Sequence, residues 1–424
     1  MSRPGPVDPR ITLLALALVA FGLLMVYSAS SMLSVLRFDN GHAFLESQAV
    51  KAGAGLAAMF VVARVDYHRW ETAARPLLAV SLALVALTVI PGLERISPEI
   101  NGARRWLAVP GLSFQPSEVL KLAVVVWMAS ALARRGEALE RFTTGPLPLC
   151  AVPALGLGLL VLQPDFGSGL FLGLLVAVML FLGGVRWRHL LALCAAAVPL
   201  FVGLALAEPY RVQRLLAFRE PDKYLDSLSY QVHQSLISLG SGGLFGVGIG
   251  SSKQKFFFLP EAHTDFIFAI IGEELGFAGA ALTLAAFLYL GWVGCRVARR
   301  ARDPFGAMLA GGLTALLVVG GVFNIGVATG NLPTTGLTLP FISYGATSLT
   351  VSLVAMGALM NLSRPRPAAD RVLAPARAAD SSPTRRPPQR PLLPRAPRGR
   401  PVGPTAARSS WPGGGRGGRE RRAP

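Results

Sequence analysis

The sequence predicts an all-α integral membrane protein of about ten transmembrane helices, with a large external loop between the seventh and the eighth. Three observations support this fold class. The 424 residues are 52% hydrophobic and have a mean hydropathy of +0.50. Only 15% of them are charged, whereas soluble domains usually carry about 25%. Apolar stretches of about 20 residues, long enough to cross a bilayer, recur along the chain.

Each apolar stretch is a predicted helix, separated from the next by polar or basic residues. The first has no small-residue cleavage site after it, so we expect a retained helix rather than a removed signal peptide. Residues 1–10 precede it as a short cytoplasmic segment. In order, the predicted helices cover residues 11–35, 44–64, 74–93, 116–134, 145–163, 168–184, 188–207, 265–296, 305–329 and 341–363.

The arginines orient these helices, because basic residues gather in the cytoplasmic loops of membrane proteins. They are frequent after the second, fourth, sixth and eighth predicted helices and scarce in the short loops on the other side. Both termini are therefore expected in the cytoplasm, and the loop of residues 208–264 outside. A loop of this length is typical of a functional segment. It carries Arg211, Arg214 and the glycine-rich run 240–250.

The positive charge of the chain is concentrated near its end. The sequence has 41 basic and 23 acidic residues, a net charge of +18, and much of the excess lies in residues 364–424. This segment is rich in Pro, Arg and Gly without apolar periodicity, so we expect a disordered cytoplasmic tail. It is suited to weak attraction to anionic lipid or acidic partners. The high net charge is therefore a property of this tail and not of the membrane portion. We expect no nucleic-acid partner.

Titratable residues crowd the start of the eighth predicted helix. Glu261 and His263 come just before it, and Asp265 stands where the chain enters the membrane. We expect Thr264 to cap this helix and Asp265 to be its first residue, where the helix dipole favours a carboxylate. A capping role alone is one interpretation of Asp265. The clustering of titratable groups at a cleft indicates instead a functional site, with His263 as a second candidate base or a loop histidine.

Two further acids, Glu273 and Glu274, lie deeper in the same predicted helix. Glu273 is eight residues beyond Asp265, about 12 Å along a helix. That separation is too large for the two carboxyl groups to share a proton. We therefore expect Glu273 and Glu274 to bond to neighbouring helices.

A second polar constellation surrounds the start of the fourth predicted helix. Glu118 and Lys121 are three residues apart, so they share one face and can pair. The pair either neutralises itself inside the membrane, or Lys121 joins Arg104 and Arg105 in an external cationic patch. Arginine pairs suit phosphate recognition because they donate bidentate hydrogen bonds.

Two loops interrupt the apolar pattern without adding basic residues. Residues 163–167 read Gln-Pro-Asp-Phe-Gly, a common turn sequence. Residues 331–345, between the last two predicted helices, are interrupted by Gly and Pro and carry no charge. Broken backbone at membrane depth is tolerated only when it is buried in protein or lines a cavity. This segment therefore predicts a re-entrant loop beside a polar cavity.

Six blocks together resemble the shape, elongation, division and sporulation family of bacterial cell-wall glycosyltransferases. They cover essentially the whole membrane portion in order and leave out only the tail. The wording of the block at 259–276 is more similar to the division member than to the elongation member, which tends to carry Arg at the position of Ala262. Ala346 departs from the glycine common in the family, with a slight local effect expected. The blocks are NGARRWL, FQPSEVLK, LQPDFGSG, YQVHQSLISLGSGGLFGVGIGSSKQK, LPEAHTDFIFAIIGEELG and NLPTTGLTLPFISYGATS.

The resemblance implies a ten-helix enzyme that polymerises lipid II into glycan strands for septal cell wall and releases undecaprenyl pyrophosphate. The catalytic aspartate of the family corresponds to Asp265, which would act as general base on the acceptor sugar hydroxyl. A divalent cation, Mg²⁺ or Mn²⁺, is a candidate cofactor, and no organic cofactor is expected. The substrate-binding candidates are Arg104, Arg105, Glu118, Lys121, Arg211, Arg214, Lys253, Lys255, Glu261 and His263.

The resemblance also implies partners and a location. The expected partners are a class B penicillin-binding transpeptidase and other membrane proteins of the division apparatus. The expected location is the bacterial cytoplasmic membrane at the division septum. Three alternatives stay open: a lipid II flippase, the elongation polymerase, and a non-catalytic division scaffold in which Asp265 is dispensable. A transporter should show internal repeats, and we find none in the sequence.

Overall fold

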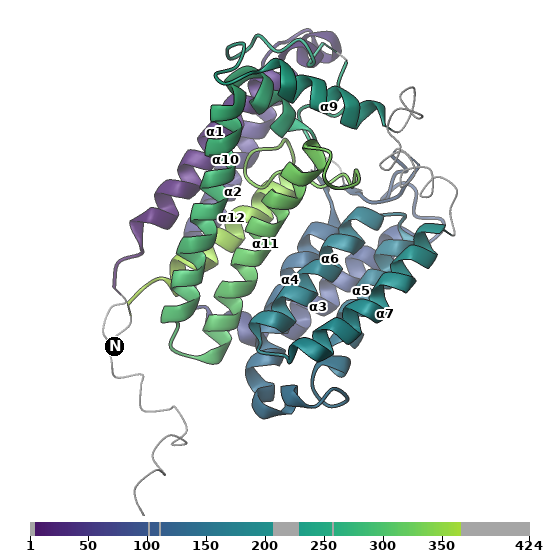
Figure 1. Cartoon of the computed structure of the whole chain (residues 1–424), viewed down its shortest axis with the longest axis vertical. Coiled ribbons are helices and arrows are strands. Elements are labelled where there is room, and N and C mark those ends of the chain that lie inside the picture. The colour runs from purple at the N-terminus through teal and green to yellow at the C-terminus, as the bar shows by residue number, and fades with distance from the viewer. Residues whose placement is uncertain (1–4, 101, 110–111, 207–228, 257, 366–424) are drawn as a thin grey trace, which may run out of the picture. The chain divides into compact units, whose positions relative to one another are not determined.

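The computed structural model describes residues 5–100, 102–109, 112–206, 229–256 and 258–365, and it is built mainly from helices (Figure 1). Within these residues, ten helices follow the ten predicted stretches in order, which confirms the fold class. They are α1 (Pro9–Phe38), α2 (Ala43–Arg64), α3 (His68–Val89), α4 (Pro116–Arg135), α5 (Pro146–Leu162), α6 (Phe166–Leu182), α7 (Trp187–Leu206), α10 (Ile267–Arg300), α11 (Pro304–Ala328) and α12 (Ala346–Leu362).

Shorter elements fill the connections. A hairpin of β1 (Leu107–Val109) and β2 (Leu112–Phe114) precedes α4, and a 3-10 helix (Gly136–Glu140) follows it. The long predicted loop between α7 and α10 contains one more helix, α9 (Tyr230–Ser241). Arg211, Arg214 and the predicted tail beyond residue 365 lie outside the described residues.

Most of the ten helices have the length and composition of membrane spans. Six of those described qualify by both criteria, namely α1, α3, α4, α7, α10 and α11. The helices α5, α6 and α12 are apolar but have only 17 residues each. Helix α2 carries Glu46 and Lys51 among its 22 residues. The chain is therefore a multi-pass membrane protein, as the sequence predicts.

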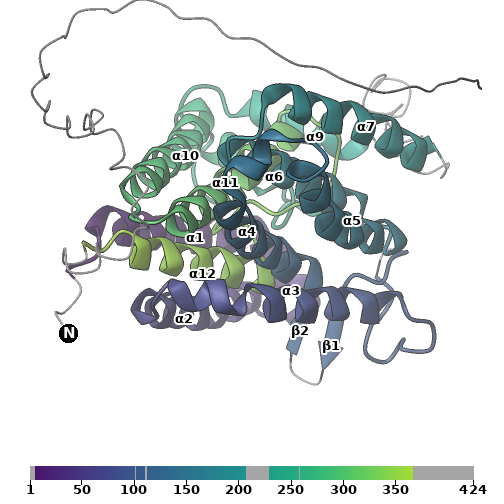
Figure 2. The same ribbon diagram turned by 90° about the horizontal axis from the view of Figure 1, so that it is seen from below.

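Helix α4 is the core of the bundle. It packs against α3, α6, α11 and α12 (Figure 2). In the most apolar 18-residue stretch of α4, 78% of the residues are buried inside the protein. In the corresponding stretch of α7, no residue is buried. Helix α7 instead exposes large apolar side chains such as Trp187 and Leu200. An outward-facing apolar helix of this kind suits contact with lipid.

Small residues bring α2 and α12 into close contact. A Cβ atom added at Gly357 of α12 would lie 2.4 Å from the carbonyl oxygen of Met59 in α2. Membrane helices commonly use small residues in this way, because dispersion contacts replace the hydrophobic effect between helices in lipid. This contact holds α12 and the segment before it against the N-terminal helices.

The segment between α11 and α12 re-enters the bundle, as predicted. Leu339, Phe341 and Ile342 are at most 2% exposed. The last helix was predicted to begin at 341, but it begins at Ala346, because Phe341 has φ 68° and the Tyr344 N–H donates to the His263 carbonyl. Ala346 is the first residue of α12, and alanine is favourable in a helix.

The eighth predicted helix differs most from expectation. It was predicted to run unbroken through 265–296, but α10 begins at Ile267 and is broken at Gly276. Gly276 has φ 68° and ψ −166°, a conformation essentially restricted to glycine. Nine residues, Ile267–Leu275, therefore form a separate buried helical segment ahead of the long part of α10.

The glycine-rich segment 242–248 fills this break. Before the break, the carbonyl groups of Glu273 and Glu274 accept hydrogen bonds from loop N–H groups, both at 3.0 Å. After the break, the N–H groups of Phe277 and Ala278 donate to loop carbonyl groups at 2.8 and 3.1 Å. The loop therefore satisfies four of the main-chain groups that the break would otherwise leave unpaired inside the membrane.

Glycine is required on both sides of this contact. A Cβ at Gly246 would lie 2.1 Å from the Glu274 oxygen, and one at Gly276 would lie 2.4 Å from the Gly246 nitrogen. The glycine-rich run therefore has a structural role that its sequence alone does not reveal. It fixes the helical segment that follows Asp265.

Candidate functional site

Asp265 lies in the turn before α10, not in its first helical turn. The residue at the N-cap position is Phe266, so the predicted cap at Thr264 is wrong. The Thr264 hydroxyl instead donates to the Glu261 carboxylate at 2.7 Å. Glu261 has φ 55°, and its carbonyl group accepts from the Thr264 and Phe266 N–H groups, both at 3.2 Å. A tight turn centred on Glu261 thus replaces the expected helix start.

Three successive carbonyl groups anchor this turn to the re-entrant segment and to α11. The His263 carbonyl accepts from the Tyr344 N–H at 2.9 Å. The Thr264 carbonyl accepts from the Ser343 hydroxyl at 2.5 Å. The Asp265 carbonyl accepts from the Asn324 amide at 2.8 Å. The main chain of Asp265 is therefore held by its neighbours, independently of its side chain.

The Asp265 carboxylate faces the turn at 334–336. A Cβ at Gly336 would lie 3.6 Å from Asp265 Oδ2, and Gly336 has φ 73°. The side chain of Asp265 is half-buried and has polar contacts of its own. A partly exposed carboxylate on a fixed main chain is suited to accepting a proton from a bound hydroxyl.

His263 is packed among aromatic rings beside this turn. Its ring centroid lies 5.1 Å from that of Phe44 and 5.6 Å from that of Tyr344. Burial lowers the pKa of His263, an effect that the nearby Glu261 carboxylate opposes and Arg37 reinforces. His263 therefore favours the neutral form, while Glu261 is exposed. Both residues lie in the Asp265 turn, as the sequence predicts.

The two predicted arginines lie on the hairpin side of the bundle and differ in their contacts. Arg104 forms an ion pair with Glu94 at 2.9 Å near the surface. Arg105 donates to the carbonyl group of Pro164 at 2.5 Å. Within the described residues, Arg105 Nε is buried without a hydrogen-bond partner.

The turn at 163–167, which Arg105 contacts through Pro164, packs against the turn at 334–336, which faces Asp265. A Cβ at Gly167 would lie 2.1 Å from the Thr335 carbonyl oxygen. Buried oxygens are left without hydrogen-bond partners in this region of the described structure: Asp165 Oδ2, Asn324 Oδ1 and Thr335 Oγ1. Such oxygens suit a hard divalent cation or the polar groups of a substrate. Within the described residues, no cluster of three or more His, Cys, Asp and Glu side chains has metal-binding geometry.

Glu118 and Lys121 pair inside the bundle, in agreement with the first of the two interpretations of their spacing. Their charged groups are 2.6 Å apart, and their side chains are 11% and 5% exposed. They line a cavity of about 30 Å³ together with Thr338 and Ser348, which has room for about one water molecule. Lys121 therefore does not join Arg104 and Arg105 on a surface patch.

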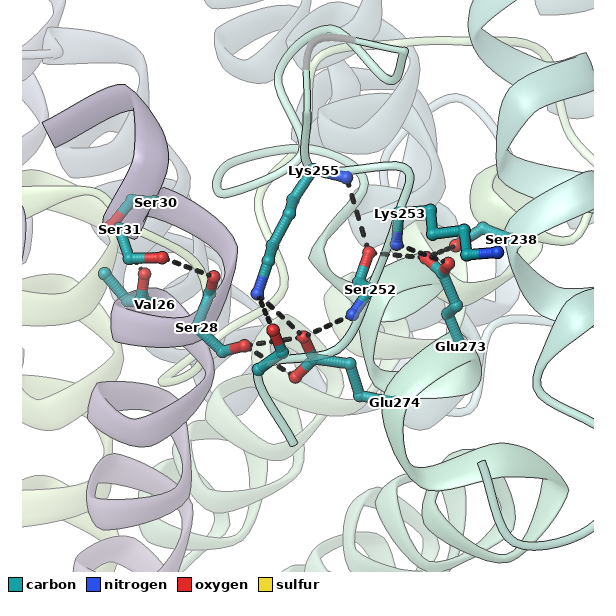
Figure 3. A network of polar contacts seen from close by, with 11 residues as sticks. Val26, Ser28, Ser30, Ser31, Ser238, Ser252, Lys253, Lys255, Glu273 and Glu274 are labelled. Atoms are coloured by element: carbon teal, nitrogen blue, oxygen red, sulfur yellow. Dashed lines mark hydrogen bonds and ion pairs between the residues drawn. The ribbon is translucent and has the colours of Figure 1, made fainter. Parts of the chain in front are cut away.

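Lys255 is also buried, in a network around Glu273 and Glu274 (Figure 3). Its ammonium group donates to the Gly250 carbonyl at 2.5 Å and lies 3.5 Å from Glu274. Glu274 also accepts from the Ser28 hydroxyl of α1 at 2.6 Å. The structure thus uses Lys255 to compensate a buried carboxylate.

Glu273 is satisfied mainly by hydrogen bonds. It accepts from the hydroxyl groups of Ser238 in α9 and Ser252 at 3.0 and 2.5 Å, and from the Lys253 N–H at 2.8 Å. The Lys253 side chain itself is exposed. Together with the Ser28 bond to Glu274, these contacts confirm that both glutamates bond to neighbouring helices.

Fold and site together define a polytopic helical membrane protein that holds one aspartate between a broken helix and a re-entrant loop. The chain belongs to the FtsW, RodA and SpoVE family of cell cycle proteins, whose family model matches residues 9–367. This confirms the resemblance that the sequence blocks indicate.

Individual relatives agree with this assignment. The chain is 44% identical over 356 residues to the probable peptidoglycan glycosyltransferase FtsW of Geobacter metallireducens, covering 84% of this chain and 94% of the relative. It is 31% identical to a chain in a peptidoglycan synthase complex that coordinates polymerization and crosslinking, with a TM-score of 0.69 over 84% of this chain and 97% of that one. It is 30% identical to the rod shape determining protein RodA of Thermus thermophilus, with a TM-score of 0.62 over 84% and 96% of the two chains.

Proposed function

We propose that this protein is a peptidoglycan glycosyltransferase that polymerises lipid II into glycan strands during cell division. The observation that carries the proposal is the fixed position of Asp265 between α10 and the re-entrant loop, in a chain of this family. The division role is supported by 44% identity to a relative named FtsW, against 30% to the RodA structure. Elongation is the alternative role.

The reaction forms a bond between an acceptor sugar hydroxyl and the anomeric carbon of a donor sugar. The bond from that carbon to the lipid pyrophosphate breaks, and undecaprenyl pyrophosphate leaves with its electron pair. Because pyrophosphate is already a good leaving group, the chemistry needs a base more than a general acid. In our proposal the Asp265 carboxylate takes the proton of the acceptor hydroxyl.

Groups around Asp265 are suited to the substrate's polar parts. Arg105 contacts Pro164, in the turn at 163–167 that packs against the segment facing Asp265. Its neighbour Arg104 is partly exposed. Arginine binds pyrophosphate oxygens in a bidentate manner. Arg211, Arg214 and the exposed Lys253 stay candidates for the same role. The buried Lys121 and Lys255, each paired with a glutamate, are suited to holding the helices instead.

We propose that a divalent cation acts as cofactor in this region. Asp265 and the unpartnered Asp165 Oδ2 are the carboxylate oxygens that could hold it. Mg²⁺ is commonly bound by one or two carboxylates together with substrate phosphates. When bound, such an ion would neutralise charge on the departing pyrophosphate.

A class B penicillin-binding transpeptidase is the proposed membrane partner, because one structural relative acts within a peptidoglycan synthase complex. We place the enzyme in the bacterial cytoplasmic membrane at the septum, with Asp265 outside and both termini inside. The orientation rests on the basic loops at the other end of the bundle.

A flippase is the second candidate function, since both activities need polar groups within a bundle. The polymerase is favoured, because a 44% identical relative is named a probable peptidoglycan glycosyltransferase and because the sequence shows no internal repeat of the kind common in transporters. The test is polymerisation of purified lipid II by the full-length protein in detergent, with and without the transpeptidase. A micelle has no two compartments, so glycan strands can form there only by catalysis. A protein that forms no strands under either condition but moves lipid II across vesicles would be a transporter.

A further inference from the structure

A basic pocket lies at the end of α10 far from Asp265. The continuous part of α10 beyond the break at Gly276 has 24 residues, about 36 Å at 1.5 Å per residue, so this pocket is remote from the proposed chemistry. Its volume is about 310 Å³. Four arginines and one carboxylate line it, together with Tyr67 and Ser363; the charged residues are Arg296, Arg300, Arg302, Arg364 and Asp8.

At least one guanidinium group there has unused hydrogen-bonding capacity. Within the described residues, Arg364 Nε is buried and has no hydrogen-bond partner. A buried donor left unpaired is unfavourable, so this group favours a ligand that can accept its hydrogen bond. Arg296 stacks over the ring of Trp292 at 3.7 Å, a contact that uses the guanidinium face and leaves its N–H edge for an anion.

The acidic groups near the pocket are already engaged. Asp8 caps α1 and accepts from the Arg10 N–H at 3.0 Å. The Asp8 N–H donates to the Ser363 hydroxyl at 3.1 Å, which ties the N-terminal segment to the end of α12. Asp303 accepts from the Tyr67 hydroxyl and from the Gly306 N–H. The pocket therefore presents excess positive charge in a fixed frame.

The neighbouring face of α10 is apolar and exposed. Leu288, Tyr289 and Trp292 are 56%, 41% and 46% exposed, and the two aromatic rings stack with centroids 5.6 Å apart. Tyrosine and tryptophan are typical of the membrane interface. This face leads along α10 towards Arg296 and Arg300.

We propose that this pocket binds the phosphate headgroup of an anionic glycerophospholipid, with the acyl chains along the exposed face of α10. Bidentate arginine contacts would hold the phosphate. A lipid also needs an apolar surface for its acyl chains, which a soluble phosphate does not need. The exposed apolar face of α10 provides this surface. Basic pockets between helix ends at the cytoplasmic side are suited to such headgroups.

The test is native mass spectrometry of the full-length protein in nanodiscs of phosphatidylcholine with added phosphatidylglycerol. The variant Arg300→Gln/Arg364→Gln removes two pocket charges. The matched control Arg188→Gln/Arg299→Gln removes two exposed charges outside the pocket. We expect the pocket variant to retain phosphatidylglycerol about tenfold less than the control does, since loss of charged hydrogen bonds is worth at least about a factor of ten. Both variants should keep wild-type thermal stability and helicity.

Equal loss in both double variants would mean diffuse surface attraction and would overturn the proposal, as would no loss in either. A further arm adds inorganic phosphate to the wild-type protein. Displacement of phosphatidylglycerol at millimolar inorganic phosphate would assign the pocket to a soluble anion instead of a lipid. Retention of the lipid under the same conditions supports the assignment.

Discussion

Asp265 is placed by residues that are distant in sequence. Asn324 donates one hydrogen bond to the Asp265 carbonyl at 2.8 Å and another to the Leu337 carbonyl at 2.6 Å. One amide therefore fixes the aspartate relative to the loop that its carboxylate faces. Asn324 acts as a positioning residue in this account, because its donors bind main chain rather than substrate.

We predict that Asn324→Leu lowers kcat about 10- to 100-fold with little change in KM. Leucine has a similar size and cannot donate, so Asp265 loses its anchor, and a loss of about 1–3 kcal/mol corresponds to this range. The control is Thr314→Val in the same helix, whose hydroxyl donates to the Ala310 carbonyl one turn earlier. Steady-state polymerisation of lipid II measures both variants. Equal kcat values for the two would remove Asn324 from the positioning role.

His263 gives the protein a defined pH dependence. Burial lowers its pKa below the ordinary value of 6.5, so the unfolded chain binds a proton at a higher pH than the folded protein does. Stability therefore falls as the pH falls below 6.5 towards the folded-state pKa. We predict that lowering the pH from about 7.5 to about 5.5 reduces the Tm of the wild type more than that of His263→Phe. An equally steep decline in the variant would show that other groups cause the loss.

The type of residue at the site was predictable from sequence, but its partners were not. An aspartate at a membrane boundary signals function, because ionisable groups are costly there. The hydrogen bonds from Asn324 and Ser343 that fix the Asp265 turn span 59 and 79 positions in the sequence. The bond from Ser28 to the Glu274 carboxylate spans 246 positions. Asn324, Ser343 and Ser28 are common polar residues that no local pattern pairs with an acid. Their roles follow only from the folded arrangement.

At the level of elements, the predicted helix order was correct because hydrophobic length is a strong local signal. The predicted course of α10 was wrong for a tertiary reason. A glycine inside an apolar run is compatible with a straight helix, and only the inserted loop at 242–248 makes the break at Gly276 favourable. Likewise, Glu261 rather than Thr264 organises the start of α10.

The break in α10 predicts opposite effects for two glycines of one helix. Gly276→Ala should lower the free energy of unfolding by about 2 kcal/mol or more, because its backbone conformation excludes other residues and its Cβ would meet Gly246. Gly291→Ala should be neutral or slightly stabilising, since its Cβ meets only Val318 at ordinary contact distance. Thermal unfolding in detergent compares them. Equal stability of the two variants would contradict the break.

The pair between Glu118 and Lys121 predicts non-additive effects. Removing one charge, as in Lys121→Met, leaves the other buried and unpaired, at a cost of about 3–5 kcal/mol. The double variant Glu118→Gln/Lys121→Met removes both charges and should insert and unfold nearly as the wild type does. Yield and Tm of the two single variants and the double variant measure this. A double variant less stable than either single variant would show that the pair does more than neutralise itself.

At the scale of the whole molecule, the proposed catalytic site and the arginine pocket lie at opposite ends of the helix bundle. The Asp265 turn and the re-entrant loop form one end, where the lipid-linked sugar is proposed to react. The arginine pocket forms the other end, which the basic loops predict to be cytoplasmic. This arrangement suits an enzyme that works on one face of the membrane.

The central claim is that Asp265 is the base of a glycan polymerase, and Asp265→Asn tests it most directly. The change keeps the size of the side chain and the anchored main chain, so folding should persist. The control Asp39→Asn removes an exposed carboxylate from the α1–α2 turn, where asparagine is readily accepted at φ 52°. Polymerisation of purified lipid II by the full-length protein with the proposed transpeptidase partner should fall at least about a hundredfold in Asp265→Asn and stay unchanged in the control. A folded Asp265→Asn protein that polymerises lipid II near the wild-type rate would contradict the account.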